Sequence, residues 1–220
     1  MCDFDGTISI DDVTDSILLR FARPGWEALE SAWRAGRMGS RECMAGQVAL
    51  LDCSAEELDA HVEQLPIDPH FAAFAALVAA AGVQLTIASD GLDRALHVLL
   101  RRHRLDQLPT RASRLVQAGP RRWRLEFPHA MPGCRSKAAT CKCAVVAAAR
   151  ERGDAPVLMI GDGASDRCVA GAADLTFARK ELLAYCAERD LPHEGVADFA
   201  AAIAAWQVLA AAPRATQAIL

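Results

Sequence analysis

Two short apolar stretches, residues 83–88 and 156–160, constrain the fold of this chain more than any other feature. The second stretch, Pro-Val-Leu-Met-Ile, is apolar throughout, which is typical of a strand buried on both faces. Segments with helical spacing surround the two stretches, over residues 71–82, 93–102 and 142–151. Such repeated strand–helix units predict an α/β fold, a Rossmann-like parallel sheet with helices on both faces.

The chain also opens on a short predicted strand, which runs into a turn at Asp3-Phe4-Asp5-Gly6-Thr7. From about residue 11 to residue 75, helix formers dominate and apolar residues recur at helical spacing. We therefore expect a core domain of residues 1–10 and 76–220, interrupted in sequence by a helical cap domain of residues 11–75. We also expect a hairpin across residues 113–127 and a helix near the C-terminus that breaks at Pro213.

Composition excludes several classes of protein. The 220 residues are 52% hydrophobic and carry a net charge of −4, which allows a full globular core and argues against a nucleic-acid partner. No apolar run reaches the ~18 residues of a membrane span, so we expect no membrane partner and a cytoplasmic location. The eight cysteines are expected to be reduced. Alanine-rich helices leave both a monomer and a homodimer open.

Polar side chains follow three predicted strands: Asp3 with Asp5, Ser89 with Asp90 and Gly91, and Asp162 with Asp166. Because ligands bind at the carboxyl edge of an open α/β sheet, we expect these groups to share one crevice. Crowded carboxylates repel one another unless a cation lies among them, and a set of oxygen ligands suits Mg²⁺.

A phosphoryl group would need positive charge and hydrogen-bond donors at the same edge. Lys142, at the start of a predicted helix, and the hydroxyl of Ser89 could supply them, with Lys137 as the alternative lysine. The pattern indicates a site for phosphoryl transfer.

These residues resemble, in order, the four motifs of the haloacid dehalogenase superfamily of aspartyl-phosphate phosphatases. The matching positions are Asp3 to Thr7, Ser89, Lys142, and Gly161 to Asp166. The helical insertion after the first motif resembles the cap of the phosphoserine-phosphatase-like branch. Within that branch the chain looks most like the enol phosphatases of methionine salvage, and the resemblance covers essentially the whole chain.

The resemblance implies a phosphomonoesterase that acts on a small phosphorylated metabolite. It implies that Asp3 is the nucleophile, that Asp5 is the acid and base, and that Lys142 is catalytic. Thr7 and Ser89, with Asp90 and Gly91 beside it, would bind substrate and phosphate. Mg²⁺ would be held by the side chains of Asp3 and Asp162 and the backbone carbonyl of Asp5, with Asp166 orienting its waters or binding it directly.

Several alternatives stay open on the residues alone. Asp90 suits either a helix N-cap or a contact to substrate hydroxyls. Cys134, Cys141 and Cys143, with His129 nearby, could be reduced thiols or a zinc site, although paired Cys-x2-Cys spacing is absent. A phosphoserine or sugar-phosphate phosphatase fits the same motifs. A binding module without catalysis is a further possibility of another class.

Overall fold

The computed structural model describes residues 1–211, which form two compact units. The first unit comprises Met1–Ile10, Ile67–Ile87 and the chain from Lys142 onward, and the second comprises Asp11–Pro66 and Ala88–Cys141. The units therefore group residues 11–66 with residues 88–141, and the division into a core and a cap domain stays a prediction. The expected break at Pro213 lies outside the described residues.

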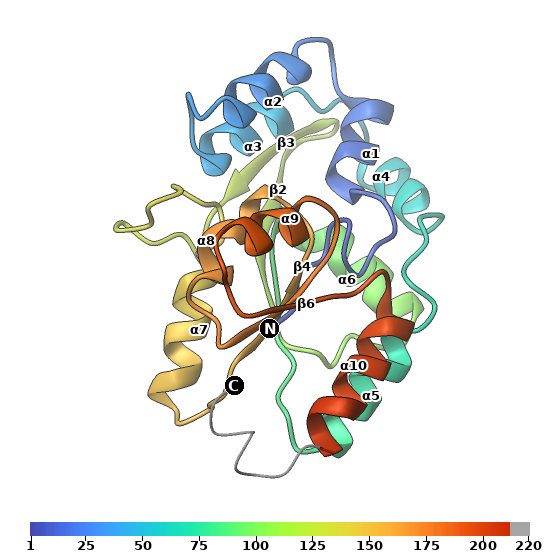
Figure 1. Ribbon diagram of the computed structural model, residues 1–220. Helices are drawn as coiled ribbons and strands as arrows, with labels where there is room; N and C mark the ends of the chain where they lie inside the picture. The colour runs from blue at the N-terminus through green and yellow to red at the C-terminus, as the bar shows by residue number, and fades with distance from the viewer. Residues whose placement is uncertain (212–220) are drawn as a thin grey trace. The chain divides into compact units, whose positions relative to one another are not determined.

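Four helices occupy the N-terminal part of the second unit, as the helical spacing predicts (Figure 1). They are α1 (Val13–Phe21), α2 (Trp26–Arg34), α3 (Ser40–Ala49) and α4 (Ala55–Val62). Local capping explains where α1 and α4 begin. The Asp12 carboxylate accepts from the Asp15 N–H, and Ser54 and Glu57 form a reciprocal capping box.

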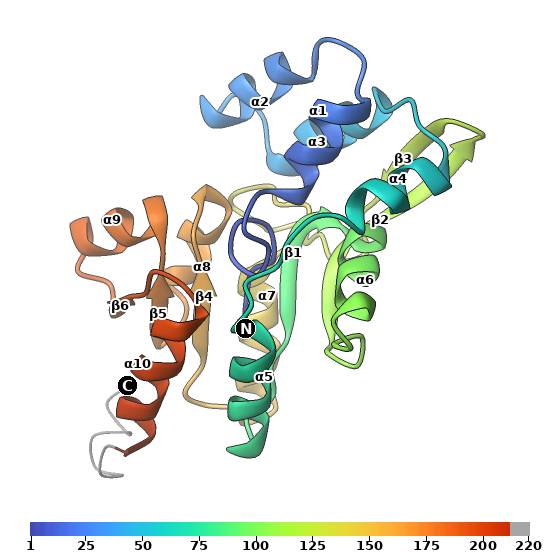
Figure 2. The ribbon, with the colours of Figure 1, turned by 90° about the vertical axis from the view of Figure 1, so that its right-hand side faces the viewer.

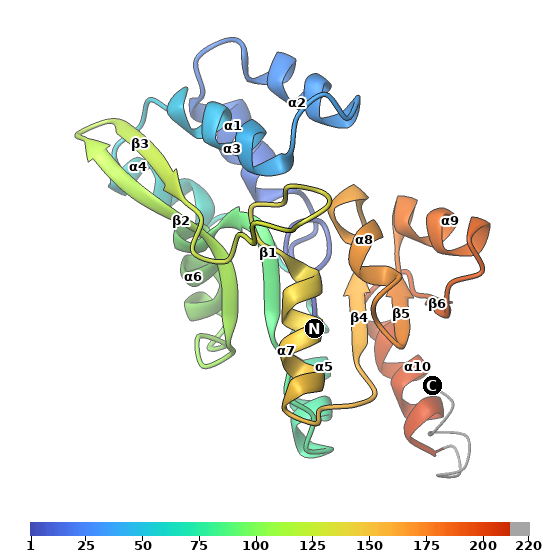
Figure 3. The same ribbon diagram turned by 90° about the vertical axis from the view of Figure 1, so that its left-hand side faces the viewer.

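The remaining part of the second unit builds a three-stranded sheet of order β1 (Ile87–Leu92), β2 (Thr110–Gly119) and β3 (Arg122–Glu126). β2 and β3 form the predicted antiparallel hairpin, and α6 (Asp93–Arg102) packs beside β2 (Figure 3). The start of β1 differs from the prediction. Residues 83–86 lie outside the strand, so Ser89, Asp90 and Gly91 lie within β1 rather than after it.

The first unit contains the parallel sheet β4 (Leu158–Gly161), β5 (Leu175–Ala178) and β6 (His193–Gly195) (Figure 2). The helices α7 (Lys142–Glu151), α8 (Arg167–Ala170) and α9 (Lys180–Glu188) belong to the same unit, with the 3₁₀ turn η1 (Ala164–Asp166). The predicted opening strand is reduced to one bridging residue. Cys2 pairs in parallel with both Ile87 and Ile160, while residues 3 and 4 already leave the ladder.

Two more helices of the first unit, α5 (Phe71–Ala80) and α10 (Phe199–Ala211), pack side by side (Figure 1). The Phe199 ring lies 4.9 Å from that of Phe71 and 5.3 Å from that of Phe74, and all three side chains are buried. Within residues 1–211, no helix has the length and apolar character needed to cross a membrane. The architecture is α/β, with a parallel sheet and an antiparallel hairpin.

Candidate active site

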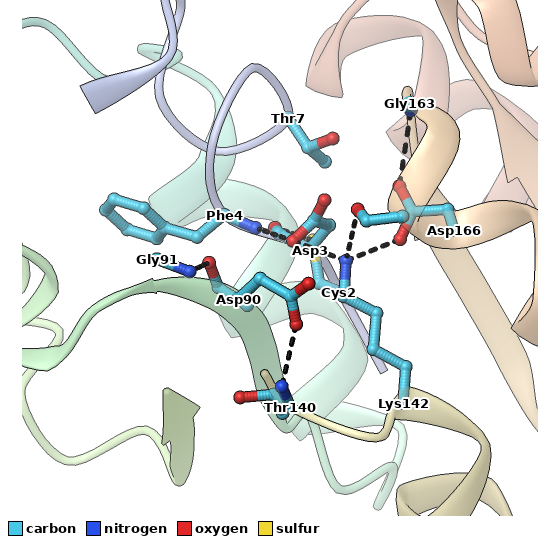
Figure 4. Close-up of polar contacts among 12 residues, drawn as sticks. Cys2, Asp3, Phe4, Thr7, Asp90, Gly91, Thr140, Lys142, Gly163 and Asp166 are labelled. Atoms are coloured by element: carbon cyan, nitrogen blue, oxygen red, sulfur yellow. Dashed lines mark hydrogen bonds and ion pairs between the residues drawn. The ribbon is translucent and has the colours of Figure 1, made fainter. Parts of the chain in front are cut away.

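A buried lysine lies between two buried aspartates in the first unit (Figure 4). The Lys142 Nζ atom, in the first residue of α7, lies 2.8 Å from Asp3 Oδ1 and 2.6 Å from Asp166 Oδ1. The Ser165 hydroxyl is a further partner at 3.2 Å. The structure thus brings together three predicted site residues that are up to 163 positions apart. The alternative lysine, Lys137, is exposed in the second unit, and the catalytic role of Lys142 stays a prediction.

Backbone contacts fix Asp3 in this position. Its N–H donates to the Ile160 carbonyl of β4, and its own Oδ1 accepts from the Phe4 N–H at 2.8 Å. Burial raises the pKa of Asp3 well above its ordinary value, the charge of Asp166 raises it further, and the Lys142 ammonium opposes both. Lys142 therefore offsets part of the electrostatic cost of an ionised carboxylate at this position.

Asp162, just after β4, completes a cluster of three carboxylates with Asp3 and Asp166. One oxygen of each lies within 4.8 Å of the others, and among the described residues no other cluster of this kind includes three or more acidic, histidine or cysteine side chains. Oxygen ligands at this spacing suit a hard divalent cation, and Asp166 Oδ2 is already oriented by the Asp162 and Gly163 N–H groups. The residues present therefore fit a divalent metal.

The turn that follows Asp3 lies against the same cluster. Gly6 has a φ of +70°, a conformation that favours glycine, and the Thr7 hydroxyl donates to Asp162 Oδ1 at 3.0 Å. Asp5 is half-buried in this turn and lies outside the three-carboxylate cluster. Its predicted roles, as acid and base and as a metal ligand through its carbonyl, stay predictions.

Ser89, Asp90 and Gly91 belong to the second unit and are described within it. The buried Ser89 hydroxyl accepts from the Gly91 N–H at 2.8 Å. Asp90 binds within its own unit. Its Oδ2 accepts from the Ser40 hydroxyl at 2.5 Å. Its Oδ1 accepts from the Thr140 N–H at 2.7 Å (Figure 4). Asp90 therefore ties the start of α3 to the loop before α7, and its role toward substrate stays a prediction.

The cysteine-rich stretch shows local contacts rather than a metal cluster in the described chain. Cys134 Sγ lies 3.3 Å from the Ser136 hydroxyl and 3.5 Å from the Ala138 N. Although burial raises the pKa of Cys134, these hydrogen bonds outweigh it, and the net shift is downward. Cys143 instead lies in the first unit, with its sulfur 2.9 Å from that of Cys168.

Two basic residues at the end of β5 contact the site and were not predicted to do so. Arg179 Nη1 donates to the Thr7 carbonyl at 2.6 Å, and Lys180 Nζ donates to the Gly6 carbonyl at 2.8 Å and to Asp162 Oδ2 at 2.9 Å. No local pattern marks these long-range contacts. One signal was available, since Lys180 is one of only three lysines in the chain.

Comparison with known proteins agrees with this geometry. The model of the haloacid dehalogenase-like hydrolase family matches residues 1–171. The chain is 32% identical over 205 residues to the 2-hydroxy-3-keto-5-methylthiopentenyl-1-phosphate phosphatase of Geobacillus kaustophilus, with 90% of each chain covered. It is 31% identical over 198 residues to the protein of the same name in Geobacillus thermodenitrificans, with 87% of each covered.

The fold matches solved structures of phosphoserine phosphatase. One, a phospho-aspartyl intermediate analogue, superposes with a TM-score of 0.67 at 18% identity over 90% of this chain and 92% of that one. The chain belongs to the haloacid dehalogenase-like hydrolases. Within that family it is a phosphatase, a phosphoric monoester hydrolase with a phosphoserine-phosphatase-like structure.

Proposed function

We propose that the chain is a Mg²⁺-dependent phosphomonoesterase that works through an aspartyl-phosphate on Asp3. The arrangement of Asp3, Lys142 and Asp166 carries this proposal, because it supports a carboxylate nucleophile with a fixed ammonium at 2.8 Å. Mg²⁺ would be held by the side chains of Asp3 and Asp162 and the backbone carbonyl of Asp5, with Asp166 orienting its waters or binding it directly. It would supply positive charge that neutralises the phosphoryl oxygens.

The chain's own residues would divide the remaining work. Asp3 attacks phosphorus in line with the leaving oxygen, while Lys142 stabilises negative charge on the phosphoryl group and keeps Asp3 oriented. Asp5 protonates the leaving oxygen and later removes a proton from the water that hydrolyses the aspartyl-phosphate. Hydroxyls of Thr7 and Ser89 hydrogen-bond the phosphate.

For the substrate we propose a small phosphorylated metabolite, with 2-hydroxy-3-keto-5-methylthiopentenyl-1-phosphate as the specific compound. Support comes from the two Geobacillus phosphatases, which bear that name and align over about nine-tenths of this chain. The helices of residues 11–75 would act as a cap, excluding water and contacting the leaving group. The indole rings of Trp26 and Trp33 on α2 are half-buried and offer apolar surface for a methylthio tail.

The test is phosphate release, with Mg²⁺ and with EDTA, from a panel that contains this enol phosphate, phosphoserine, sugar phosphates and an aryl phosphate. We expect selective, Mg²⁺-dependent turnover of the enol phosphate. Asp3→Asn should reduce turnover by at least ~10³-fold, because the amide cannot act as the nucleophile. The matched control is Asp106→Asn, at an exposed position of the second unit, which should retain wild-type turnover.

Each departure from that result has a distinct meaning. Preference for phosphoserine or a sugar phosphate would support the phosphatase mechanism and assign a different substrate. Equal turnover by Asp3→Asn and wild type would refute the role of Asp3 as the nucleophile. Tight binding of phosphate without turnover of any ester would favour the binding module.

A further inference from the structure

Lys180 connects two parts of the site that the motifs treat separately. Its Nζ atom donates to Asp162 Oδ2, after β4, and to the Gly6 carbonyl, in the turn after Asp3. The other Asp162 oxygen accepts from the Thr7 hydroxyl. Both oxygens of this candidate metal ligand are therefore oriented by donors, and one of those donors is a cation.

The backbone is shaped to bring this ammonium into place. Lys180 has a φ of +43°, in the left-handed region that a residue with a Cβ adopts only at an energetic cost. A Cβ at Gly6 would lie 2.6 Å from Asp162 Oδ2 and 2.9 Å from Lys180 Nζ, so a side chain there would displace both groups from their present contact. Two residues with positive φ, Lys180 and Gly6, are thus joined by the hydrogen bond from Lys180 Nζ to the Gly6 carbonyl.

The identity of the residue is also unusual for this chain. Only three of its 24 basic residues are lysines, Lys137, Lys142 and Lys180, and the rest are arginines. Two of the three contact the carboxylates of the site. Lysine differs from arginine in presenting a compact point charge on a flexible stem.

The charges at the site determine how the contact between Lys180 and Asp162 affects metal binding. Asp3, Asp162 and Asp166 together carry three negative charges when ionised, and Lys142 and Lys180 carry two positive ones. A divalent cation that binds Asp162 would therefore meet a monovalent cation already bonded to the same carboxylate. Lys180 thus holds Asp162 in place and opposes the binding of the divalent cation.

We propose that Lys180 is a positioning residue, a built-in counter-cation that orients Asp162 and the Gly6 turn and weakens the affinity of the site for divalent metal. The inference rests on the proposed metal-dependent function, and it identifies Lys180 as the residue that adjusts the metal affinity of that site. It predicts two opposite effects of removing the charge. Metal should bind more tightly, because repulsion is lost and Thr7 still orients Asp162, while turnover at saturating metal should fall, because Asp162 has lost its second donor.

The test is calorimetric titration of the metal-free protein with MgCl₂, in the absence of any substrate. We expect Lys180→Met to bind Mg²⁺ about tenfold more tightly than wild type, the effect of removing one partly screened unit charge. Lys180→Arg retains the unit charge in a different shape, so its Mg²⁺ affinity should lie closer to that of wild type than to that of Lys180→Met. Lys137→Met removes an exposed charge from the second unit and should leave the affinity unchanged.

Turnover then separates positioning from charge alone. With Mg²⁺ saturating, kcat of Lys180→Met should fall by about tenfold, within the range seen when a partner of a metal ligand is lost. Unchanged or weaker Mg²⁺ binding by Lys180→Met would overturn the proposal, as would a wild-type protein that binds no Mg²⁺. Tighter Mg²⁺ binding by Lys180→Met supports the role of Lys180 even if the protein hydrolyses no phosphate ester. Absence of hydrolysis would instead refute the proposed phosphatase function.

Discussion

Lys142 carries a positive charge in a place where solvent contributes almost nothing, since its side chain is 3% exposed. Its two partners, Asp3 and Asp166, are 6% and 0% exposed at the side chain. Burial of three charges is tolerated because they are mutually hydrogen-bonded, and removal of the shared member leaves two like charges facing one another. We therefore expect the same residue to contribute to stability as well as to the proposed chemistry.

We expect Lys142→Met to lower the free energy of unfolding by about 3–5 kcal/mol, the usual cost of breaking a buried ion pair. Denaturant unfolding followed by circular dichroism measures it. Lys137→Met provides the exposed counterpart and should change stability by no more than about 0.5 kcal/mol. Equal unfolding midpoints for the two variants would show that the buried charges are compensated in another way.

His61 introduces a pH dependence in the second unit. Its Nε2 lies 2.9 Å from the Ser16 hydroxyl, and its ring meets that of Phe21 edge-on at 5.5 Å. Burial lowers the pKa of His61 below its ordinary value of 6.5, so the folded protein binds this proton less readily than the unfolded chain. The contribution to stability is therefore present above pH 6.5 and is lost as the pH falls through the lowered folded-state pKa.

We expect the thermal midpoint of the wild-type protein to fall more steeply between pH 7.5 and pH 5 than that of His61→Gln. A glutamine retains a hydrogen-bonding group toward Ser16 and cannot acquire the charge. The measurement is the difference in midpoint between the two proteins at each pH, which cancels the other titrating groups. A difference that does not change with pH would contradict the assignment.

At the scale of elements, one carboxylate serves the beginnings of two helices. Asp68 is 6% exposed, its Oδ1 accepts from the His70 N–H before α5, and its Oδ2 accepts from the Phe199 N–H at the start of α10. The N-terminus of a helix leaves backbone N–H groups unpaired and attracts negative charge, so the Asp68 carboxylate stabilises the start of α10 directly and the turn that leads into α5. Asp68 therefore links the segment before α5 to the start of α10, where Phe71 packs on Phe199.

We expect Asp68→Ala to destabilise the protein by about 2–3 kcal/mol, because hydrogen bonds to two backbone N–H groups are lost at once and the Phe199 N–H is buried. Asp198→Ala is the matched variant. Asp198 is exposed and caps α10 alone through the Ala201 N–H, so its loss should cost about 1 kcal/mol. Equal costs, measured by denaturant unfolding, would show that Asp68 acts on one helix only.

Local signals in the sequence predicted the helices best. α6 begins at Asp93 and α7 at Lys142, as expected, because periodicity and flanking residues are short-range properties. Strand limits were harder. β1 begins at Ile87 rather than at residue 83, since a strand requires a paired neighbour and the opening segment contributes only Cys2.

At the scale of the whole molecule, the sequence predicted which distant residues meet when each followed a strand or began a helix, as Asp3, Asp162 and Lys142 do. It did not predict the partners of Asp90 or the contacts of Arg179 and Lys180. Ser40 lies 50 positions from Asp90, and Gly6 lies 174 positions from Lys180, and no spacing rule relates them. Tertiary packing alone determines such contacts.

Metal binding should be visible in the stability of the whole molecule. A ligand that binds only the folded state at ~100 times its Kd adds about 2.7 kcal/mol, which corresponds to roughly 5–10 °C for a chain of this size. We expect MgCl₂ to raise the thermal midpoint of the wild-type protein, EDTA to reverse the rise, and Asp162→Asn to show little of it. A thermal midpoint of the wild-type protein that does not change with Mg²⁺ would argue against a metal at the three carboxylates.

Because the chain contains only three lysines, covalent labelling of amines can monitor the contacts of the site. A reagent that acylates amines has one exposed lysine target in Lys137, one half-exposed target in Lys180 and one buried target in Lys142, besides the Met1 α-amino group, which is hydrogen-bonded to the Leu158 carbonyl. Mass spectrometry of the labelled protein would therefore report on the candidate site at the carboxyl end of β4 through its lysines. Acylation at Lys180, compared with that at Lys137, would follow the engagement of its ammonium by Asp162 in the unaltered protein, with no substrate present.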